Sequence, residues 1–457
     1  MIKKLAAASC LLVSVALALP KEPPKEPAFY TTPKVVANGS VIEIGIGDSL
    51  KNTLKGAQPG DVVLLHSGTY PASGGLEITR PGTADAWVVL KGKPGTRPVI
   101  DLNGGELHIG ASYVLLENLE IVNGTGNNIH IIPENARTPI SNIILKNVRS
   151  AEMARGTGAA LKIAGNWRNG HGVPTEQVYV EDCDLSGSRD NALVDGVAVR
   201  KSVVRNCWIH DAVRVSMKNP GIFFKGGSSD ILIEKNLISG IRGNAAVMIG
   251  GDTDKPWFDA LYVEKKLEGA NQVVRNNIIC DCDDAVFEVR GAKGVKIFDN
   301  TVVTASAFAV FRFTWGGGGS GEKIGNDDVE IANNLVVATK GPKFALNDGN
   351  EDMKVKFGPQ LWAGRFSRAE GRGLPRFPGE RDVSVGSGDE VLASTDDTKL
   401  KGLSDALERF RPARGSPALK AGSPVDACPR DVMDVVRSTT APSIGAFESD
   451  AKPKPKK

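Results

Sequence analysis

The sequence predicts an all-β solenoid, a coil of short parallel strands closed at its N-terminal end by a helix. One phrase, in which alternating apolar residues lead to a polar turn residue, recurs eight times between residues 113 and 339. Alternation with a period of two is typical of strands. Successive copies are irregularly spaced, with a separation of only 23 residues between Asn277 and Asn300. This irregularity argues against repeats of fixed length such as leucine-rich repeats or propeller blades.

The turn residues of the repeat predict a ladder that runs through the coil. The aligned copies are YVLLENLEI, IILKNVRS, VYVEDCDLSG, SVVRNCWIHDA, ILIEKNLISGI, QVVRNNIICD, VKIFDNTVVTA and VEIANNLVVAT. Equivalent residues of stacked strands lie about 4.8 Å apart, and an asparagine amide both donates and accepts hydrogen bonds. We therefore expect a continuous stack of turn side chains. Its predicted members are Asn118, Asn147, Cys183, Cys207, Asn236, Asn277, Asn300 and Asn334. Cys183 and Cys207 are expected to be neighbours, either as stacked thiols or as a disulfide.

Five segments are predicted along the chain. Residues 1–18 resemble a signal peptide, because two lysines precede a short apolar run and a small-residue cleavage site. Residues 19–34 are assigned to a Pro-rich linker. Residues 35–345 are assigned to the solenoid, residues 346–448 to an irregular capping segment and residues 449–457 to a basic disordered tail. A helix from about residue 49 to residue 57 is expected to cap the first rung.

The leader predicts export, to the periplasm, the cell surface or the outside of the cell. An alternative is a lipoprotein signal that uses Cys10, although the apolar run before this cysteine is short for a signal sequence. No apolar run in the mature chain is long enough to span a bilayer. We expect a monomer without an integral membrane segment.

Composition and charge exclude several other function classes. The 457 residues carry a formal net charge of +3, which is too small to predict a nucleic-acid partner. Removal of the leader would leave five cysteines, an odd and small number that does not fit a disulfide scaffold. Cys280 and Cys282 are expected to be buried small side chains rather than metal ligands. The five histidines share no metal-ligand spacing along the sequence.

The repeated phrases resemble those of the right-handed parallel β-helix proteins. This superfamily includes chondroitinase B, alginate lyases and pectate lyases, and the chain is most similar to an uncharacterised secreted bacterial branch of it. The resemblance covers about residues 40–345. The closing phrase APSIGAFE, near the C-terminus, resembles the end of many secreted β-helix proteins. The resemblance implies a right-handed coil and a carbohydrate-active function.

Charged residues at the centres of successive strands predict a functional face. Alternation places them outward, on one sheet of the coil. They are Lys162, Asp195, Lys225, Arg290 and Arg312. A column rich in cations suits an anionic polymer, because Arg binds carboxylates in a bidentate manner and Lys acts as a point charge. Outward lysines are also common in sheets as protection against edge pairing.

The phrase around Lys225 resembles a lysine motif of chondroitinase B and the related alginate lyases. The resemblance implies that Lys225 is the base that removes the proton next to a uronate carboxyl group. Arg290 and Asp195 are further candidate catalytic residues because they belong to the same predicted column. In that family an Arg-His-Gly phrase follows one rung later. This chain has Ala-Val-Met-Ile-Gly-Gly there, and Arg242, the nearest arginine, falls in a turn.

An insertion at residues 250–271 predicts a wall beside this face. Its Trp257, and Trp315 in a later Gly-rich loop, are expected to stack on sugar rings. Further substrate-binding residues are expected among the cations of the face. They are Lys162, Arg242 and Arg312. Asp252 and Asp254 are candidate ligands of Ca²⁺, a hard cation that prefers carboxylate oxygens.

The sequence therefore favours a secreted protein that binds an acidic, uronate-containing polysaccharide and cleaves it by β-elimination. Two alternatives remain open. One is a non-catalytic β-helix that serves as a surface or carbohydrate-binding protein. The other is a glycoside hydrolase of the β-helix type, which would need paired carboxylates on one face. No cofactor other than Ca²⁺ is expected.

Overall fold

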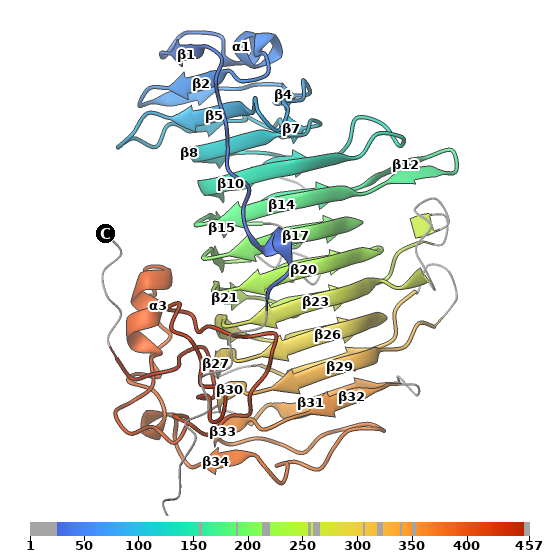
Figure 1. Cartoon of the computed structure of the whole chain (residues 1–457), viewed down its shortest axis with the longest axis vertical. Helices are drawn as coiled ribbons and strands as arrows, with labels where there is room; N and C mark the ends of the chain where they lie inside the picture. The colour runs from blue at the N-terminus through green and yellow to red at the C-terminus, as the bar shows by residue number, and fades with distance from the viewer. Residues whose placement is uncertain are drawn as a thin grey trace, which may run out of the picture.

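The computed structural model describes residues 25–154, 158–188, 191–212, 220–254, 257–258, 266–304, 307–317, 323–338, 341–349 and 353–451. The predicted signal peptide and most of the basic tail lie outside these residues. The described chain coils into a stack of rungs, from the first rung at the N-terminal end to β34 at the other (Figure 1). All pairings between successive rungs are parallel, so the predicted parallel β-helix is confirmed.

The coil has three faces. The first face consists of β1 (Val41–Ile44), β2 (Val62–Leu65), β5 (Val88–Gly92), β8 (Val114–Val122), β10 (Ile140–Ala151), β14 (Thr175–Glu181), β17 (Val199–Arg205), β20 (Ser228–Glu234), β23 (Gly269–Arg275), β26 (Ala292–Phe298), β29 (Asp327–Ala332) and β32 (Val355–Phe357). The second face consists of β3 (Thr69–Pro71), β6 (Val99–Asp101), β15 (Asp184–Ser186), β18 (Trp208–His210), β21 (Leu237–Ile241), β24 (Ile278–Cys282), β27 (Thr301–Thr304), β30 (Leu335–Ala338), β33 (Leu361–Gly364) and β34 (Val383–Val385), together with the C-terminal halves of β8 and β10.

The third face is a separate ten-stranded sheet. It consists of β4 (Leu76–Ile78), β7 (Leu107–Ile109), β9 (Ile129–Ile131), β11 (Leu161–Ala164), β16 (Val194–Val197), β19 (Ile222–Lys225), β22 (Val247–Gly250), β25 (Ala285–Arg290), β28 (Ala309–Thr314) and β31 (Lys343–Asp348). An antiparallel hairpin of β12 (Asn166–Arg168) and β13 (His171–Val173) projects after β11 (Figure 1).

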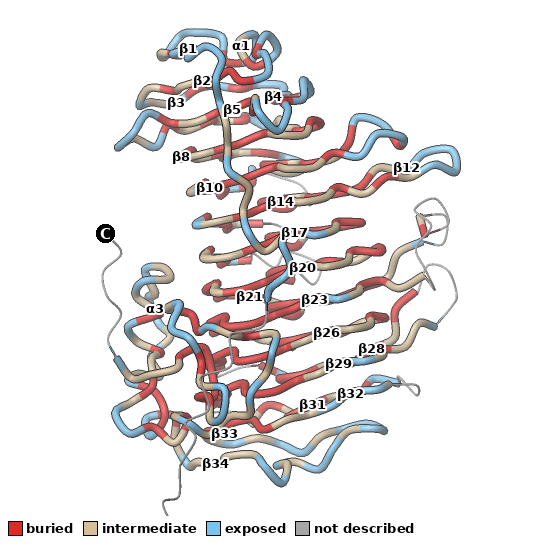
Figure 2. The backbone as a smooth tube through the Cα atoms, viewed as in Figure 1, coloured by how far each residue is buried: buried red, intermediate tan, exposed pale blue. Residues whose placement is uncertain are grey.

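Alternation along each strand separates the core from the surface. In β19, Ile222 and Phe224 are completely buried, whereas Phe223 and Lys225 between and beyond them are half-buried on the outside. Figure 2 shows buried backbone continuing from rung to rung. Burial of each large apolar side chain contributes about 1.5–3 kcal/mol. Stacked rungs therefore build one continuous core, and the functional side chains are those that alternation turns outward.

The predicted ladder exists and runs through the buried turn between the first and second faces. Cys207 N donates to Asn236 Oδ1 at 2.9 Å. The same contact, at 3.0–3.1 Å, links Asn236 to Asn277, Asn277 to Asn300 and Asn300 to Asn334. Each of these amides also donates to a backbone carbonyl. The ladder continues one rung further than predicted, because Asn334 N donates to Gln360 Oε1 at 2.9 Å.

Asn118 and Asn147 are not members of the ladder, so the prediction is wrong for these two rungs. Strand register aligns Val148, not Asn147, with Cys183. Asn118 and Asn147 lie one position earlier, where φ is 56° and 51°, and Asn147 Nδ2 donates to Asn118 Oδ1 at 2.7 Å. Asparagine is also favoured at such left-handed positions. The two positions therefore accept the same residue type for different reasons.

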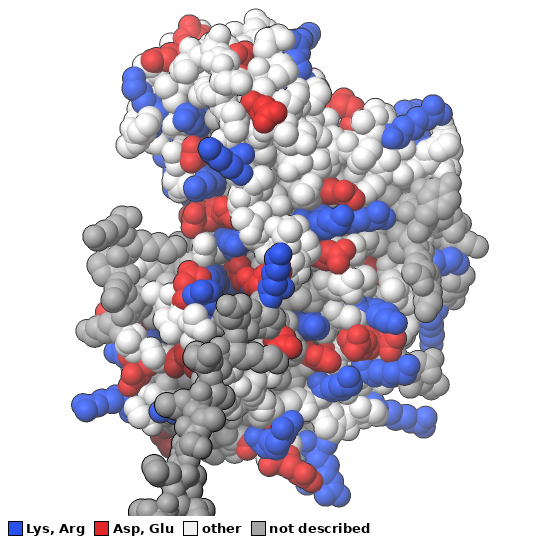
Figure 3. All heavy atoms as spheres, in the orientation of Figure 1, with Lys and Arg blue, Asp and Glu red and all other residues white. Residues whose placement is uncertain are grey.

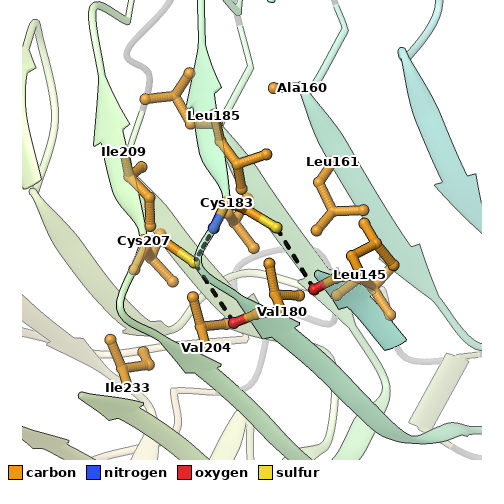
Figure 4. Packing of buried hydrophobic residues seen from close by; sticks show 14 of the residues in the cluster. Leu145, Ala160, Leu161, Val180, Cys183, Leu185, Val204, Cys207, Ile209 and Ile233 are labelled. Atoms are coloured by element: carbon orange, nitrogen blue, oxygen red, sulfur yellow. Dashed lines mark hydrogen bonds between the residues drawn. The ribbon is translucent and has the colours of Figure 1, made fainter. Parts of the chain in front are cut away.

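Cys183 and Cys207 are neighbours with free thiols. Figure 4 shows them in consecutive rungs, and Cys183 N lies 3.4 Å from Cys207 Sγ. Each sulfur contacts a carbonyl of the preceding rung, Leu145 O for Cys183 and Val180 O for Cys207, at 3.5 Å. Burial raises the pKa of the Cys207 thiol. Of the two predicted arrangements, stacked thiols are therefore the one found.

Helix α1 (Leu50–Gly56) covers the first rung, as predicted. The Ser49 side chain caps it by accepting a hydrogen bond from Asn52 N at 3.3 Å. Leu50 and Leu54 are buried against the core of the coil. The helix therefore shields apolar surface that the first rung would otherwise expose.

The segment before the coil lies along the first face. A short 3₁₀ helix, η1 (Ala28–Tyr30), rests on β17 (Figure 1). Arg205 donates to the Tyr30 carbonyl, and the guanidinium carbon of Arg275 lies 5.4 Å from the centre of the Tyr30 ring. Burial raises the pKa of Tyr30 to about 12. Residues 25–34, predicted as part of a linker, are therefore packed against the coil.

The C-terminal segment packs along the second face (Figure 1). It contains η4 (Gly388–Glu390) and α3 (Leu403–Arg409). Phe410 and Phe447 belong to a buried cluster with Leu237 and Ile278 of the second face. Parallel pairing continues through β34, past residue 345 where the repeat places the end of the solenoid. Within the described residues, no helix combines the length and apolar character needed to cross a membrane.

Candidate functional site

The outward side chains of the ten-stranded sheet form two columns rather than the single one predicted. The inner column consists of Glu77, His108, His130, Lys162, Asp195, Phe223, Met248, Glu288, Arg312 and Leu346. The outer column lies two residues further along each strand. It consists of Ala164, Val197, Lys225, Gly250, Arg290, Thr314 and Asp348. The turns between the ten-stranded sheet and the ladder differ in length. The number of residues between a strand position and the next ladder residue therefore varies from rung to rung. This number does not show to which column a side chain belongs.

Glu288 lies at the centre of a charge network on this face. Its side chain is only 3% exposed, and its oxygens lie 4.0 Å from Arg290 and 3.9 Å from Arg312. Thr314 Oγ1 donates to Glu288 Oε1 at 3.1 Å. Burial raises the pKa of Glu288, and the Arg312 and Arg290 guanidinium groups oppose that shift. The network therefore holds a carboxyl group that takes a proton more readily than an exposed glutamate does.

The remaining cations of the two columns, except Lys225, are also held by carboxylates. Arg290 pairs with Asp252, and Arg312 lies 3.5 Å from Asp284 and 3.7 Å from an Asp348 oxygen. Lys162 pairs with Asp195, which is 4% exposed. The carboxylates that pair with cations of this face are Asp195, Asp252, Asp284, Glu288 and Asp348. The predicted column was rich in cations with one interspersed carboxylate, Asp195, whereas the face carries further carboxylates and its charge is mixed.

Lys225 differs from these cations. Among the described residues, no carboxylate oxygen lies within 4.0 Å of its Nζ, which instead lies 4.9 Å from the centre of the Phe223 ring. A Cβ atom placed on Gly251 would lie 3.0 Å from Lys225 Cδ. The lysine stem therefore lies across Gly251, next to the segment that carries Asp252. Lys225 and Arg290 thus flank the same short stretch of backbone.

A buried carboxyl group supports the end of β19 behind Lys225. Glu268 is completely buried and accepts hydrogen bonds from Gly226 N at 3.0 Å and from Thr253 N and Oγ1 at 2.6 and 2.8 Å. Burial raises the pKa of Glu268, whereas these hydrogen bonds and the Lys225 charge lower it. Glu268 therefore ties the backbone beside Lys225 to the start of the predicted wall.

Aromatic side chains from two insertions meet next to Lys225. Trp257 Nε1 donates to Gly226 O at 3.0 Å. Its ring packs edge-to-face with Trp167 of the β12–β13 hairpin, with ring centres 6.4 Å apart. Trp167 is 38% exposed. Trp257 therefore belongs to the wall beside Lys225, as predicted for the insertion. The β12–β13 hairpin, which follows the strand of Lys162, adds Trp167 to this wall.

The loop after β28 also reaches this region. Lys323 Nζ lies 5.0 Å from the centre of the Trp315 ring. A Cβ atom on Gly316 would lie 2.7 Å from Gly251 O and 2.9 Å from Glu268 Cγ. Gly316 therefore packs closely against Gly251 and Glu268, which both lie beside Lys225. Its neighbour Trp315 thus lies at the edge of the same site.

Arg242 lies apart from this cluster. It occupies the turn between β21 and β22, at the end of β22 opposite Gly250. Its guanidinium group donates to the Asp281 backbone oxygen at 2.6 Å and pairs with the Asp281 carboxylate. The structure therefore places Lys225, Arg290 and Arg312 on one face of the ten-stranded sheet, with Arg242 outside it.

The predicted Ca²⁺ ligands do not fit a calcium site. Asp252 pairs with Arg290, and Asp254 is exposed. In the described part of the chain, Asp252 and Asp254 belong to no group of three metal-ligating side chains. Ca²⁺ takes six to eight oxygen ligands, so a cation here would have to displace the arginine, and the described residues offer no cage of oxygens to receive it.

Sequence reasoning missed three residues of this site. Glu288 lies two residues before Arg290, so alternation along the strand already places it on the same side. Glu268 and Trp167 had no such signal, because they come from a long insertion and from a hairpin that interrupts the repeat. Their positions follow from how loops fold over the sheet, which strand alternation does not determine.

Comparisons with known proteins agree with the fold. Neither a family model nor a curated protein matches the chain. A pectate lyase structure matches 90% of this chain and 97% of its own, with 13% sequence identity and a TM-score of 0.56. A rhamnogalacturonan lyase (12% identity, 70% and 87% coverage, TM-score 0.45) and the A-module of an Azotobacter vinelandii mannuronan C-5 epimerase (13%, 74% and 93%, 0.48) are less similar. The chain therefore has the parallel β-helix fold of the polysaccharide lyases.

Proposed function

We propose that the protein is an exported, monomeric carbohydrate-active protein that cleaves a uronate-containing polysaccharide by β-elimination on its ten-stranded sheet. The observation that carries the proposal is the amine of Lys225, which has no carboxylate within 4.0 Å among the described residues, although Arg290 and Arg312 of the same sheet are both held by carboxylates. A lysine engaged by a carboxylate keeps its proton, whereas a catalytic base must give it up. The similarity to a pectate lyase fold supports the substrate class by analogy only.

The reaction assigns a role to each cluster member. In its deprotonated form, Lys225 would take the proton from the carbon next to the uronate carboxyl group. The electron pair of that bond forms a double bond to the neighbouring carbon, whose bond to the glycosidic oxygen breaks. The leaving oxygen receives a proton, which Lys225, now an ammonium group, returns. Arg290 binds the uronate carboxylate in place of Asp252, since guanidinium groups bind carboxylates bidentately.

The walls position the polymer. Trp257, bonded to Gly226 O, and Trp315, next to Gly316, offer aromatic surface near Lys225, and burial of a sugar ring against an aromatic ring is favourable. Lys162 lies two strands before β19 in the ten-stranded sheet and Arg312 lies three strands after it, with adjacent strands about 4.8 Å apart. A chain of sugars that crosses the rungs thus meets a cation in more than one rung.

The test is a lyase assay on pectate, alginate and chondroitin. Purified protein should release products with the ultraviolet absorbance of an unsaturated uronate, and Lys225→Ala should lower the rate by about 10²–10⁴-fold. Lys201→Ala changes an exposed lysine on β17 and should leave the rate unchanged. Activity that persists in Lys225→Ala rules out the assigned base, and binding without any product supports a carbohydrate-binding rod.

A second candidate, a glycoside hydrolase, is favoured by one observation. Glu268 and Glu288 are buried carboxyl groups whose pKa values are raised by burial, and a hydrolase needs a carboxylic acid that stays protonated. New reducing ends without ultraviolet absorbance, lost in Glu288→Gln but kept in Lys225→Ala, would identify a hydrolase instead of a lyase.

A further inference from the structure

A second cluster of chemistry-bearing side chains lies at the N-terminal end of the ten-stranded sheet. Strand register places His108 of β7 beside His130 of β9, and their ring centres are 6.1 Å apart. Glu106 precedes His108 by two residues, so alternation turns it to the same side. One ligand atom from each of Glu106, His108 and His130 lies within 4.8 Å of the other two.

We propose that Glu106, His108 and His130 bind a divalent transition-metal cation of the zinc type. Imidazole nitrogens and a carboxylate oxygen are the ligands that Zn²⁺ takes at about 2.0–2.2 Å, whereas Ca²⁺ and Mg²⁺ prefer oxygen ligands alone. The three side chains are 20–37% exposed. Rotation of these partly exposed side chains is enough to bring their ligand atoms onto one ion.

A second set of contacts already orients the ligands. Glu134 Oε1 lies 2.5 Å from His108 Nε2, and Asn127 Nδ2 donates to Glu106 Oε2 at 3.3 Å. With Nε2 donating to Glu134, His108 keeps the lone pair of Nδ1 for a metal. Zinc-binding histidines commonly have such a carboxylate partner.

A glycine makes room for the carboxylate partner. A Cβ atom on Gly110 would lie 2.0 Å from Glu134 Oε1, so any larger residue would push Glu134 away from His108. The outward face of the cluster remains open to solvent. Three protein ligands leave a fourth tetrahedral position for water or for an oxygen of a bound molecule.

The cluster is separate from the proposed catalytic centre at Lys225, although it adjoins Lys162 of the polymer path. His130 is the register partner of Lys162, which is itself paired with Asp195, whereas Lys225 lies on a later rung and in the other column. The histidines have no sequence signature because their ligand spacing is a full rung of 22 residues, from 108 to 130. The fold, not a local motif, brings them together.

The test measures binding of Zn²⁺ to untagged protein by isothermal titration calorimetry, with Ca²⁺ in parallel. One Zn²⁺ per chain and no comparable Ca²⁺ binding are expected. His108→Ala and His130→Ala should each weaken Zn²⁺ binding at least tenfold, and Glu134→Gln should weaken it by about 10–100-fold. Co²⁺ absorption in the visible region gives an independent readout of tetrahedral ligation by imidazole.

The matched control is His66→Ala. His66 also faces a carboxylate, with Nε2 2.7 Å from Glu43 Oε2, but it is outside the group of three ligands. This variant should bind Zn²⁺ like the unaltered protein. If a histidine variant misfolds by circular dichroism, Glu106→Gln replaces it in the series. Unchanged Zn²⁺ affinity in a folded His108→Ala/His130→Ala double variant, or no Zn²⁺ binding by the unaltered protein, would overturn the proposal.

Discussion

The asparagine ladder makes a sharp prediction about stability at Asn277. Its side chain makes four hydrogen bonds inside the coil. It donates to Ile233 O and to Asn300 Oδ1, both at 3.0 Å, and accepts from Asn236 N and Nδ2 at 3.1 and 3.0 Å. Asn277→Ala removes all four and leaves buried partners unsatisfied. At about 0.5–1.5 kcal/mol for each bond, the variant should lose about 4 kcal/mol of unfolding free energy.

Cys207→Ala is the matched control, because Cys207 occupies the ladder position two rungs before Asn277. Its sulfur makes the weaker contacts of a thiol, at 3.4 Å with Cys183 N, 3.5 Å with Val180 O and 3.1 Å with Arg205 O. Loss of one buried sulfur should cost about 1 kcal/mol. Urea unfolding followed by circular dichroism compares the two variants, and amide exchange at Asn236 reports the ladder locally. If both variants lost the same unfolding free energy, the idea that the hydrogen bonds of the ladder stabilise the fold beyond the packing of its side chains would be refuted.

Two further predictions concern burial. Burial raises the pKa of Asp299 to about 6, above its ordinary value of 3.8. The folded protein therefore holds this proton more tightly than the unfolded chain does. The resulting stabilisation is present below pH 4 and is lost as pH rises to 6. In Asp299→Asn, the midpoint of urea unfolding should therefore change less with pH over that range. In Gly196→Ala, the new Cβ would lie 2.2 Å from Phe224 Cδ1. It should lower stability by about 1–3 kcal/mol in thermal unfolding, whereas Gly56→Ala, which meets no atom within 4 Å, should not.

The fold was predictable because each rung repeats the same physical problem. Every rung must turn its chain at a buried corner, and Asn236, Asn277 and Asn300 solve it with the same amide contacts. Such repetition is visible in a single sequence. The error at Asn147 has the same origin, because the adjacent left-handed turn position (φ 51° at Asn147) also favours asparagine. Residue type alone does not distinguish the buried amide stack from the left-handed position next to it.

The candidate site was less predictable because it is built by side chains from different rungs. Alternation along the strands identified Lys225 and Arg290 as outward side chains. The same alternation places Glu288, two residues before Arg290, on that side as well. Which cation is held by which carboxylate depends on register, and register depends on turn lengths that the sequence does not reveal. Charge was misjudged for this reason. The column was expected to be rich in cations with one interspersed carboxylate, but ion pairs with carboxylates outside the predicted column, such as that of Arg290 with Asp252, make the charge of the face mixed.

The histidine cluster shows the same limit in another form. A zinc motif on a helix or a turn has a short spacing that can be read along the chain. In a coil of parallel strands, two neighbouring side chains are one full rung apart in the sequence. The number of residues in a rung varies with every insertion, so this spacing cannot be read as a motif. His108 and His130 can be recognised as neighbours only after β7 and β9 are aligned.

The most direct test of the proposed function is a crystal structure of Lys225→Ala with a bound oligouronate. Removal of the assigned base should stop cleavage and trap the intact substrate. The account predicts sugar density across the ten-stranded sheet, with a uronate carboxylate on Arg290 and a ring carbon facing position 225. Density on another face of the coil, or none at a saturating concentration of every uronate tested, would contradict it. The mixed charge on the first face (Figure 3) provides an internal comparison, because that face should remain free of ligand.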